Sequence, residues 1–242
     1  MKTEIENKVT EIIDESFEVE DCYKVPDIDD SRLTFGNKGL KFEATTLYID
    51  MRGSTKTLNK HKRTSVAKLH MAYFHTIVKI AKSMGGEVRS FNGDGMLVFF
   101  YGTTKRSLSD AVKAAMQMKY MLTETKVHTK MSKYSSANFG IGIDHGTILC
   151  TKVGISGTNN RDLVWIGNPV NKSVKVGDKL ESPYHIGISS YTYNNLLDDV
   201  KYHKYTDALG IERTVNMWSE GWFEYNESTI KYYYTNYYWT VN

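Results

Sequence analysis

The sequence predicts an α+β fold in which helices flank one mostly antiparallel β-sheet. The first observation behind this prediction is the order of the segments, because strand and helix patterns follow one another as β-α-β-β-α-β-β-α-β. The second is a long helical pattern at residues 56–84, whose apolar residues recur three or four positions apart on one face. The third is composition: 242 residues, 40% of them hydrophobic and 24% charged, can bury a sizeable core.

The N-terminal region precedes the predicted sheet. Residues 3–17 form a short amphipathic helix pattern, residues 16–25 can form a strand, and residues 26–39 are rich in turn residues. We assign residues 1–36 to an N-terminal extension. The chain starts with a polar, acidic segment unlike a signal peptide, and none of its apolar runs approaches the length of a membrane span. We therefore expect a soluble, cytoplasmic protein that does not bind membranes.

The central segments supply the sheet and its helices, and we assign residues 37–195 to one domain. Strands are predicted where apolar or β-branched residues run or alternate, and helices where one apolar face persists. In order, the elements are a strand at 40–50, a helix at 56–84, a hairpin of strands at 87–91 and 96–102, a helix at 106–126, a hairpin within 137–154, a strand and a helix within 161–180, and a strand at 184–190.

Turn and cap residues set the predicted element ends. Ser54 or Thr55 can cap the first long helix, and Pro169 can begin the helix that follows residue 167. The hairpin within 137–154 is predicted to turn at Asp144-His145-Gly146.

The C-terminal region, residues 196–242, is assigned to a β-rich extension packed on the same domain. It is crowded with tyrosine near its end, which is typical of an antiparallel strand pair or an edge strand.

Charge and cysteine content exclude several classes of function. The formal net charge is only +3, which is too small to indicate binding to nucleic acid or to a membrane surface. The two cysteines, Cys22 and Cys150, lack the spacing of a zinc site, so we expect reduced thiols.

Two aspartates are predicted to meet at one edge of the sheet. Asp50 ends the first strand, and Asp94 lies in the Asn-Gly-Asp-Gly turn of the first hairpin. The return strand of a β-α-β unit commonly lies beside the first strand, which would bring the two carboxylates together. Neighbouring carboxylates repel each other unless a cation lies between them, so the pair suits a divalent metal ion. Taken singly, each aspartate is equally typical of a helix cap or a turn.

The segment between the two carboxylates can bind phosphate. Residues 51–55, "MRGST", form a glycine turn that leads into a helix, where backbone N–H groups can hold a phosphate. We therefore predict substrate contacts from this turn. The residues concerned are Arg52, Gly53, Ser54 and Thr55.

These motifs resemble those of the class III nucleotidyl cyclases over residues 40–190. "LYIDMRGST" is similar to the family's first metal motif, and "GGEVRSFNGDGMLVFF" to its hairpin with Gly-Asp at the tip. "FGIGIDHGTILCTKVG" is similar to the glycine-rich hairpin that leads to the dimer interface, and "LVWIGNPVNKSVK" to the segment that ends in Asn and a later basic residue. The resemblance implies a cyclase-like, ferredoxin-like (palm) sheet that is active as a head-to-tail homodimer.

The resemblance also implies a role for each matching residue. Asp50, Asp94 and the carbonyl of Met51 would hold two Mg²⁺ or Mn²⁺ ions. Asn171 of the partner subunit would orient the ribose. Lys175 of the partner subunit would stabilise the α-phosphate, although the family usually has Arg there and lysine lacks the guanidinium fork.

The positions that read the base differ from those of purine cyclases. Ser90, with Arg89 beside it, and Val164 stand where adenylate cyclases have hydrogen-bonding base readers. Tyr48 lies on the same strand face as Asp50, where it can narrow the base pocket or simply pack in the core. The chain thus resembles the pyrimidine cyclases of Pycsar anti-phage defence, which make cyclic UMP or cyclic CMP for a separate effector. We favour UTP slightly over CTP as substrate.

Other functions remain open from the sequence. One is an adenylate or guanylate cyclase with atypical base contacts, and another is an inactive cyclase-like domain that only binds nucleotide. A diguanylate-type cyclase is disfavoured because its Gly-Gly-carboxylate-carboxylate-Phe signature is absent. The sequence does not identify the residue that holds the β- and γ-phosphates.

Overall fold

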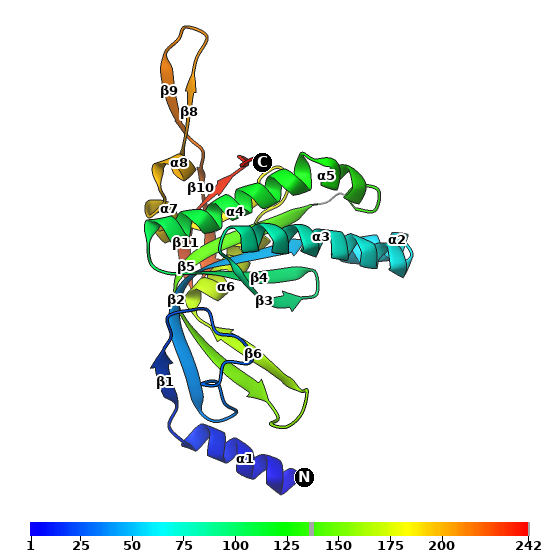
Figure 1. Cartoon of the computed structure of the whole chain (residues 1–242), viewed down its shortest axis with the longest axis vertical. Helices are drawn as coiled ribbons and strands as arrows, with labels where there is room; N and C mark the ends of the chain where they lie inside the picture. Colours follow the sequence, from blue (N-terminus) through cyan, green and yellow to red (C-terminus); the bar gives the residue numbers. More distant parts are fainter. Residues whose placement is uncertain (136–137, 242) are drawn as a thin grey trace.

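A computed structural model of the chain describes residues 1–135 and 138–241. Its main sheet has the strand order β10-β11-β7-β5-β2-β4-β3, with β1 beside β2 and β6 beside β5 (Figure 1). These strands are β1 (Glu18–Asp21), β2 (Lys38–Met51), β3 (Glu87–Asn92), β4 (Gly95–Tyr101), β5 (Phe139–Gly154), β6 (Arg161–Ile166), β7 (Ile186–Ser189), β10 (Ser219–Tyr225) and β11 (Ser228–Thr235). Among the strands of the described residues, only the pairs β1–β2 and β5–β7 are parallel, so the predicted mostly antiparallel α+β fold is confirmed.

Helices cover both faces of this sheet. The helices of the described chain are α1 (Lys2–Asp14), α2 (Ser54–Lys60), α3 (Arg63–Ser83), α4 (Lys105–Thr123), α5 (Lys126–Met131), α6 (Asn168–Asp178), α7 (Ser190–Asn194) and α8 (Asp198–Lys201). Of these, α3 and α4 pack on one face and α6 on the other, whereas α1 has no buried residue. Ile141 and Ile143 of β5 join the core cluster formed with α3 and α4. Gly140 and Gly142 point to the opposite face, because side chains alternate along a strand, and there they meet α6.

The close approach of α6 depends on glycine. A Cβ atom on Gly142 would lie 1.9 Å from the Ser173 carbonyl oxygen, far inside van der Waals contact. The glycines of β5 therefore fix the position of α6 against the sheet.

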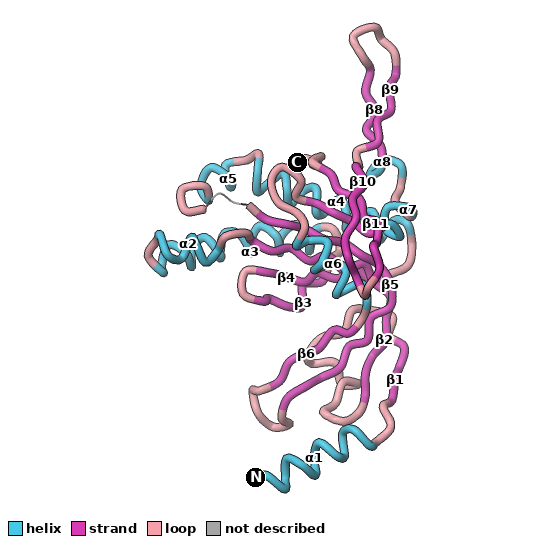
Figure 2. Tube along the Cα trace, turned by 180° about the vertical axis from the view of Figure 1, so that it is seen from behind, coloured by secondary structure: helices cyan, strands magenta, loops and turns pink. Residues whose placement is uncertain are grey.

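The long strands β2 and β5 extend from the helix-covered body into a second region with β1 and β6 (Figure 2). Helix α1 and the separate hairpin of β8 (Tyr202–Thr206) and β9 (Glu212–Asn216) lie at opposite ends of the molecule (Figure 1). Among the described residues, no helix has both the length and the apolar character needed to cross a membrane.

The predicted helix at 56–84 is wrong as one element. It is divided into α2 and α3, because His61 and Lys62 have extended backbone conformations between them. Buried apolar side chains begin only at Val66, so the core does not hold residues 56–62 in line with α3. The cap of α2 is Gly53, at φ +74°, instead of the predicted Ser54 or Thr55.

The predicted turn at Asp144-His145-Gly146 is also wrong, because β5 runs through it from Phe139 to Gly154. The polar residues there have partners on neighbouring strands: the ring Nδ1 of His145 lies 3.0 Å from the Thr45 hydroxyl, and β5 pairs with β2 along this stretch. The hairpin turns later, where Ile155 N–H donates to the Asn160 carbonyl at 3.0 Å. Residue 137 of the predicted hairpin lies outside the described residues.

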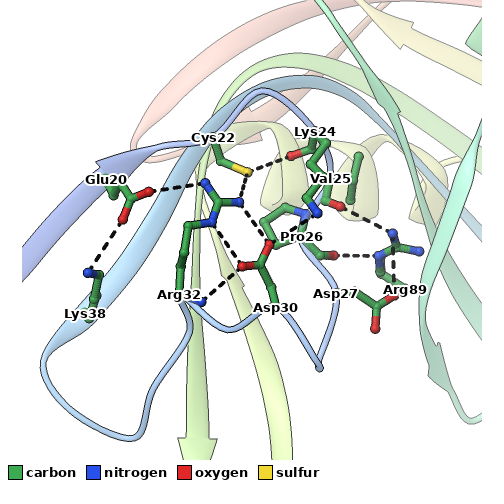
Figure 3. A network of polar contacts seen from close by, with 10 residues as sticks. All are labelled: Glu20, Cys22, Lys24, Val25, Pro26, Asp27, Asp30, Arg32, Lys38 and Arg89. Carbon is green, nitrogen blue, oxygen red and sulfur yellow. Dashed lines mark hydrogen bonds and ion pairs between the residues drawn. The ribbon is translucent and has the colours of Figure 1, made fainter.

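The N-terminal connector is held to the sheet by two arginines (Figure 3). The predicted strand at 16–25 is limited to β1, after which residues 22–37 form a loop. Arg32 pairs with Asp30 at 2.9 Å and approaches Glu20 at 3.3 Å. Arg89 donates to the Pro26 carbonyl at 2.7 Å.

The tail contains the antiparallel pair β10–β11, as predicted, and β11 also pairs with β7. The end of the tail packs on α4, where Lys119 donates a hydrogen bond to the Asn236 carbonyl. The backbone N–H of Trp239 donates to the Met116 carbonyl at 3.3 Å. The division into 1–36, 37–195 and 196–242 stays a prediction.

Candidate active site

Asp50 and Asp94 lie at the same end of two adjoining strands. In the register of β2 with β4, Asp50 is opposite Gly95, and Met51 N–H donates to the Asp94 carbonyl at 3.4 Å. The strand beside β2 is therefore β4, the second strand of the hairpin, and the expected adjacency of the return strand β3 is wrong. The aspartates still meet, because Asp94 is in the turn that joins β3 to β4.

The charge of Asp94 acts on Asp50. The pKa of Asp50 is raised from 3.8 to about 6, first by burial of its carboxyl group and then by the negative charge of Asp94. The nearby guanidinium of Arg52 opposes this effect. The pair is thus electrostatically strained as long as no further cation neutralises it.

Gly95 makes room for the side chains of Tyr48 and Asp50. A Cβ atom at this position would lie 2.6 Å from the Tyr48 hydroxyl oxygen and 3.1 Å from Asp50 Oδ1. Any side chain on residue 95 would therefore fill the space in front of Asp50. Tyr48 points into this same space, and burial, followed by the charge of Asp50, raises the pKa of its hydroxyl group.

Arg52 lies across the site, where it connects β2 to the end of α6. Its Nη1 is 3.0 Å from Asp50 Oδ2 and 3.5 Å from Asp178 Oδ1. It also donates to the carbonyl oxygens of Gly177 and, at 3.3 Å, Leu180. A Cβ on Gly140 would lie 2.7 Å from its Nη2, so that glycine makes room for the guanidinium.

Tyr73 of α3 was missed by the sequence analysis as a residue near the site. Its side chain is 1% exposed, and its hydroxyl has no hydrogen-bond partner among the described residues. Burial, followed by the charges of Asp50 and Asp94, raises its pKa well above the ordinary value. The only signal in the sequence was a tyrosine on the apolar face of a helix, which is also typical of a core residue.

The donor set fits Mg²⁺ or Mn²⁺. Among the described residues, no group of three or more His, Cys, Asp or Glu side chains forms a complete metal cage. Mg²⁺ needs no such cage, since it is typically held by one or two carboxylates together with substrate phosphates. Asp50, Asp94 and the carbonyl of Met51 offer that set, and the Tyr73 hydroxyl, which has no hydrogen-bond partner among the described residues, is an unused donor nearby.

The predicted phosphate-binding residues lie next to the carboxylates in the chain. Gly53 caps α2 and Ser54 begins it. The predicted residues therefore follow directly after β2, the strand that carries Asp50; they are Arg52, Gly53, Ser54 and Thr55. Their role in substrate binding stays a prediction.

The predicted base-reading residues are divided between two places. Tyr48 and Ser90 are both opposite Leu97 of β4, near Asp50, whereas Arg89 and Val164 lie elsewhere. Arg89 lies at a β-bulge of β3 and is bound to the 25–27 loop, where it also approaches Asp27 at 3.7 Å (Figure 3). Ser90 is half-buried on the same strand.

Val164 of β6 is 39% exposed and opposite Thr151 of β5, whereas Asp50 is opposite Gly140. Eleven residues of extended strand separate these positions, from 140 to 151, or about 35 Å. Val164 is thus distant from Asp50 of its own chain.

Asn171 and Lys175 lie one turn apart on the exposed side of α6. Within the described chain, no hydrogen bond or ion pair joins either residue to Asp50 or Asp94. Their predicted roles at the site stay predictions.

Comparisons with known proteins agree with this arrangement. Residues 39–215 match the family model described as the adenylate and guanylate cyclase catalytic domain. The uridylate cyclase of Xanthomonas perforans is 30% identical over 100% of this chain and 99% of its own length. The uridylate cyclase of Burkholderia cepacia is 29% identical over 93% of this chain and 92% of its own.

The fold has solved counterparts. The crystal structure of the guanylyl cyclase Cya2 matches 82% of this chain and 93% of its own, with a TM-score of 0.66 at 20% sequence identity. This likeness extends the agreement from sequence to the arrangement of the sheet and helices. With the family model covering most of its residues, the chain belongs to the adenylate and guanylate cyclase catalytic domain family, the class III nucleotidyl cyclases.

Proposed function

We propose that the protein is a uridylate cyclase that converts UTP to 3′,5′-cyclic UMP and pyrophosphate. The observation that carries the proposal is the proximity of Asp50, which is opposite Gly95 in β4, to Asp94 in the turn before that strand, where the Asp94 charge raises the pKa of Asp50. The chain is also related along its whole length to a named uridylate cyclase. In the reaction, a bond forms between the ribose 3′-oxygen and the α-phosphorus. The bond to the bridging oxygen of pyrophosphate breaks, and the hydroxyl proton leaves to solvent.

Asp50, Asp94 and the Met51 carbonyl would hold two Mg²⁺ or Mn²⁺ ions. When bound, such ions lower the pKa of the 3′-hydroxyl and neutralise charge on the triphosphate. The residues of this chain prepare the site: Tyr48 and Gly95 shape the space in front of Asp50, and Arg52 holds the Asp50 carboxylate in place.

We infer that the active form is a head-to-tail homodimer. Asn171 of the partner subunit would orient the ribose, and Lys175 of the partner subunit would neutralise charge on the α-phosphate. This arrangement accounts for the exposed position of both residues on α6.

The choice of pyrimidine follows from the positions that should read the base. Ser90 and Val164 lack the charged or amide groups that would form hydrogen bonds selecting a purine base. Tyr48 in addition reduces the size of the base pocket. CTP is the second candidate substrate, since neither position distinguishes uracil from cytosine.

The direct test is to incubate the purified protein with Mn²⁺ and each of UTP, CTP, ATP and GTP, and to identify products by mass spectrometry. We expect cyclic UMP to form fastest, and no product from the double variant Asp50→Ala, Asp94→Ala. If ATP or GTP is cyclised faster than both pyrimidine nucleotides, the proposed substrate is wrong.

We further propose that the product is a second messenger of bacterial anti-phage defence, made in the cytoplasm and recognised by a separate effector protein. The test compares phage plaque counts and cellular cyclic UMP in cells that carry the effector protein together with wild-type enzyme or the double variant. Equal protection by both enzymes would contradict this role.

A further inference from the structure

A cavity opens beside Arg52 and Gly53, next to the strand end that carries Asp50. Its volume is about 490 Å³. One wall is α2, and the other is the segment 132–135 that follows α5. The rings of His61 and Tyr134, 5.7 Å apart and nearly perpendicular, connect the two walls.

The lining of this cavity is strongly basic. It includes Lys56 and Lys60 from α2 and Lys133 from the opposite wall, all three exposed. Within the described part of the chain, none of these lysines has an ion-pair partner. Glu181 also lines the cavity, where it accepts a hydrogen bond from Asn138 at 3.4 Å. Three unpaired cations facing one open space attract a polyanion.

The neighbouring carboxylates determine which polyanion fits. A divalent ion held by two aspartates completes its coordination with substrate phosphates, so these must lie at the same end of β2. Arg52 belongs to both features, because it pairs with Asp50 at 3.0 Å and also lines the cavity. The cavity therefore continues directly from the place where a metal-bound phosphate would begin.

We propose that Lys56, Lys60 and Lys133 form the subsite for the β- and γ-phosphates of the nucleoside triphosphate, and then for the pyrophosphate product. This inference rests on the proposed cyclase reaction and assigns phosphate contacts that the sequence left unidentified. As the α–β phosphate bond breaks, negative charge accumulates on the departing pyrophosphate. Lysines placed around it stabilise that charge, so they act on kcat as well as on KM.

The test measures binding of inorganic pyrophosphate, with Mg²⁺ present, by isothermal titration calorimetry. The variants are Lys56→Gln, Lys133→Gln and the double variant, all at exposed positions where little effect on folding is expected. Lys79→Gln is the matched control, because Lys79 is an exposed lysine of α3 outside the cavity. We expect each single cavity variant to bind about fivefold more weakly, as for one partly exposed ion pair, and the double variant about 25-fold more weakly. The control should bind like wild type.

Pyrophosphate has no base, so the result does not depend on which nucleotide is cyclised. If pyrophosphate binding depends on the lysines but UTP is not cyclised, the subsite stands and the proposed function falls. If the double variant binds pyrophosphate as wild type does, if the control is weakened equally, or if wild type does not bind it, the subsite is overturned. Thermal unfolding of each variant checks that it is folded.

Discussion

Replacing Asp50 by asparagine should stabilise the metal-free protein. Asp50 is mostly buried, with a side chain that is 17% exposed, and it lies beside the like charge of Asp94. Its pKa of about 6, against an ordinary 3.8, means that folding disfavours the charged carboxylate. At about 1.36 kcal/mol per pKa unit, this shift of roughly two units costs about 3 kcal/mol of folding free energy at neutral pH.

Asparagine removes this cost but also removes the ion pair with Arg52. Arg52 keeps Asp178 and two carbonyl oxygens as partners, so the loss is partial. We therefore expect Asp50→Asn to raise the free energy of unfolding by about 2 kcal/mol. For a chain of this length, that corresponds to about 4 to 8 °C in Tm.

The raised pKa of Asp50 also predicts how the stability difference between the variant and wild type changes with pH. Folded wild-type protein holds the Asp50 proton up to about pH 6, whereas the unfolded chain releases it near pH 4. Between these values the folded state binds more protons, so wild-type stability from this group falls as pH rises. The stability gap between variant and wild type should therefore be small below about pH 4, open between pH 4 and 6, and stay constant above.

Urea unfolding in EDTA, from pH 4 to 8, measures the gap, and Asp14→Asn is the control because Asp14 is an exposed carboxylate of α1. Adding Mn²⁺ should stabilise wild type but not Asp50→Asn, because only the wild-type site can hold the ion. A variant less stable than wild type at pH 7.5, or a gap that does not change with pH, would refute the reasoning.

Three further predictions concern the dimer, the unpartnered hydroxyl and the loop anchor. Mixing inactive Asp50→Asn and Asn171→Ala subunits should restore about a quarter of wild-type activity, since random reassortment makes half of the dimers heterodimers with one intact site; no recovery after subunit exchange would contradict a shared site. Tyr73→Phe should leave the metal-free protein as stable as wild type or about 1 kcal/mol more stable, because the buried hydroxyl has no partner among the described residues. It should also weaken Mn²⁺ binding measured by electron paramagnetic resonance; unchanged binding would show that the hydroxyl does not serve the bound ions. Arg89→Gln should lower Tm through loss of the 25–27 loop anchor while the UTP/ATP rate ratio stays unchanged; a changed ratio would instead favour base reading.

The carboxylate pair could be predicted because its signals are local. A strand that ends in Asp50 and a Gly-Asp-Gly turn at Asp94 are each visible within a few residues of sequence. The sheet then only had to bring their strands together, and β4 does so even though β3 does not.

The structural role of Arg52 could not be predicted, because its partners are distant in sequence. Gly177 and Leu180 are 125 and 128 residues away, and their carbonyl oxygens can accept from Arg52 because α6 ends there. The Gly177 oxygen also accepts from the Leu180 N–H at 3.0 Å. The same limit applies to the turn expected at residue 144. Asp-His-Gly is a typical turn signal, but neighbouring strands offer partners that keep these residues in β5.

The glycines of β5 connect the fold to the proposed second subunit. Gly142 lets α6 approach so closely that a single added carbon would meet the Ser173 carbonyl oxygen at 1.9 Å. The inner side of α6 is therefore filled by backbone contacts, and Asn171 and Lys175 remain on the outer, exposed side. Turning them toward Asp50 of their own chain would require α6 to leave the sheet, and Arg52 would then lose its acceptors on Gly177 and Leu180. We therefore expect the carboxylates that these two residues serve to belong to a second copy of the chain.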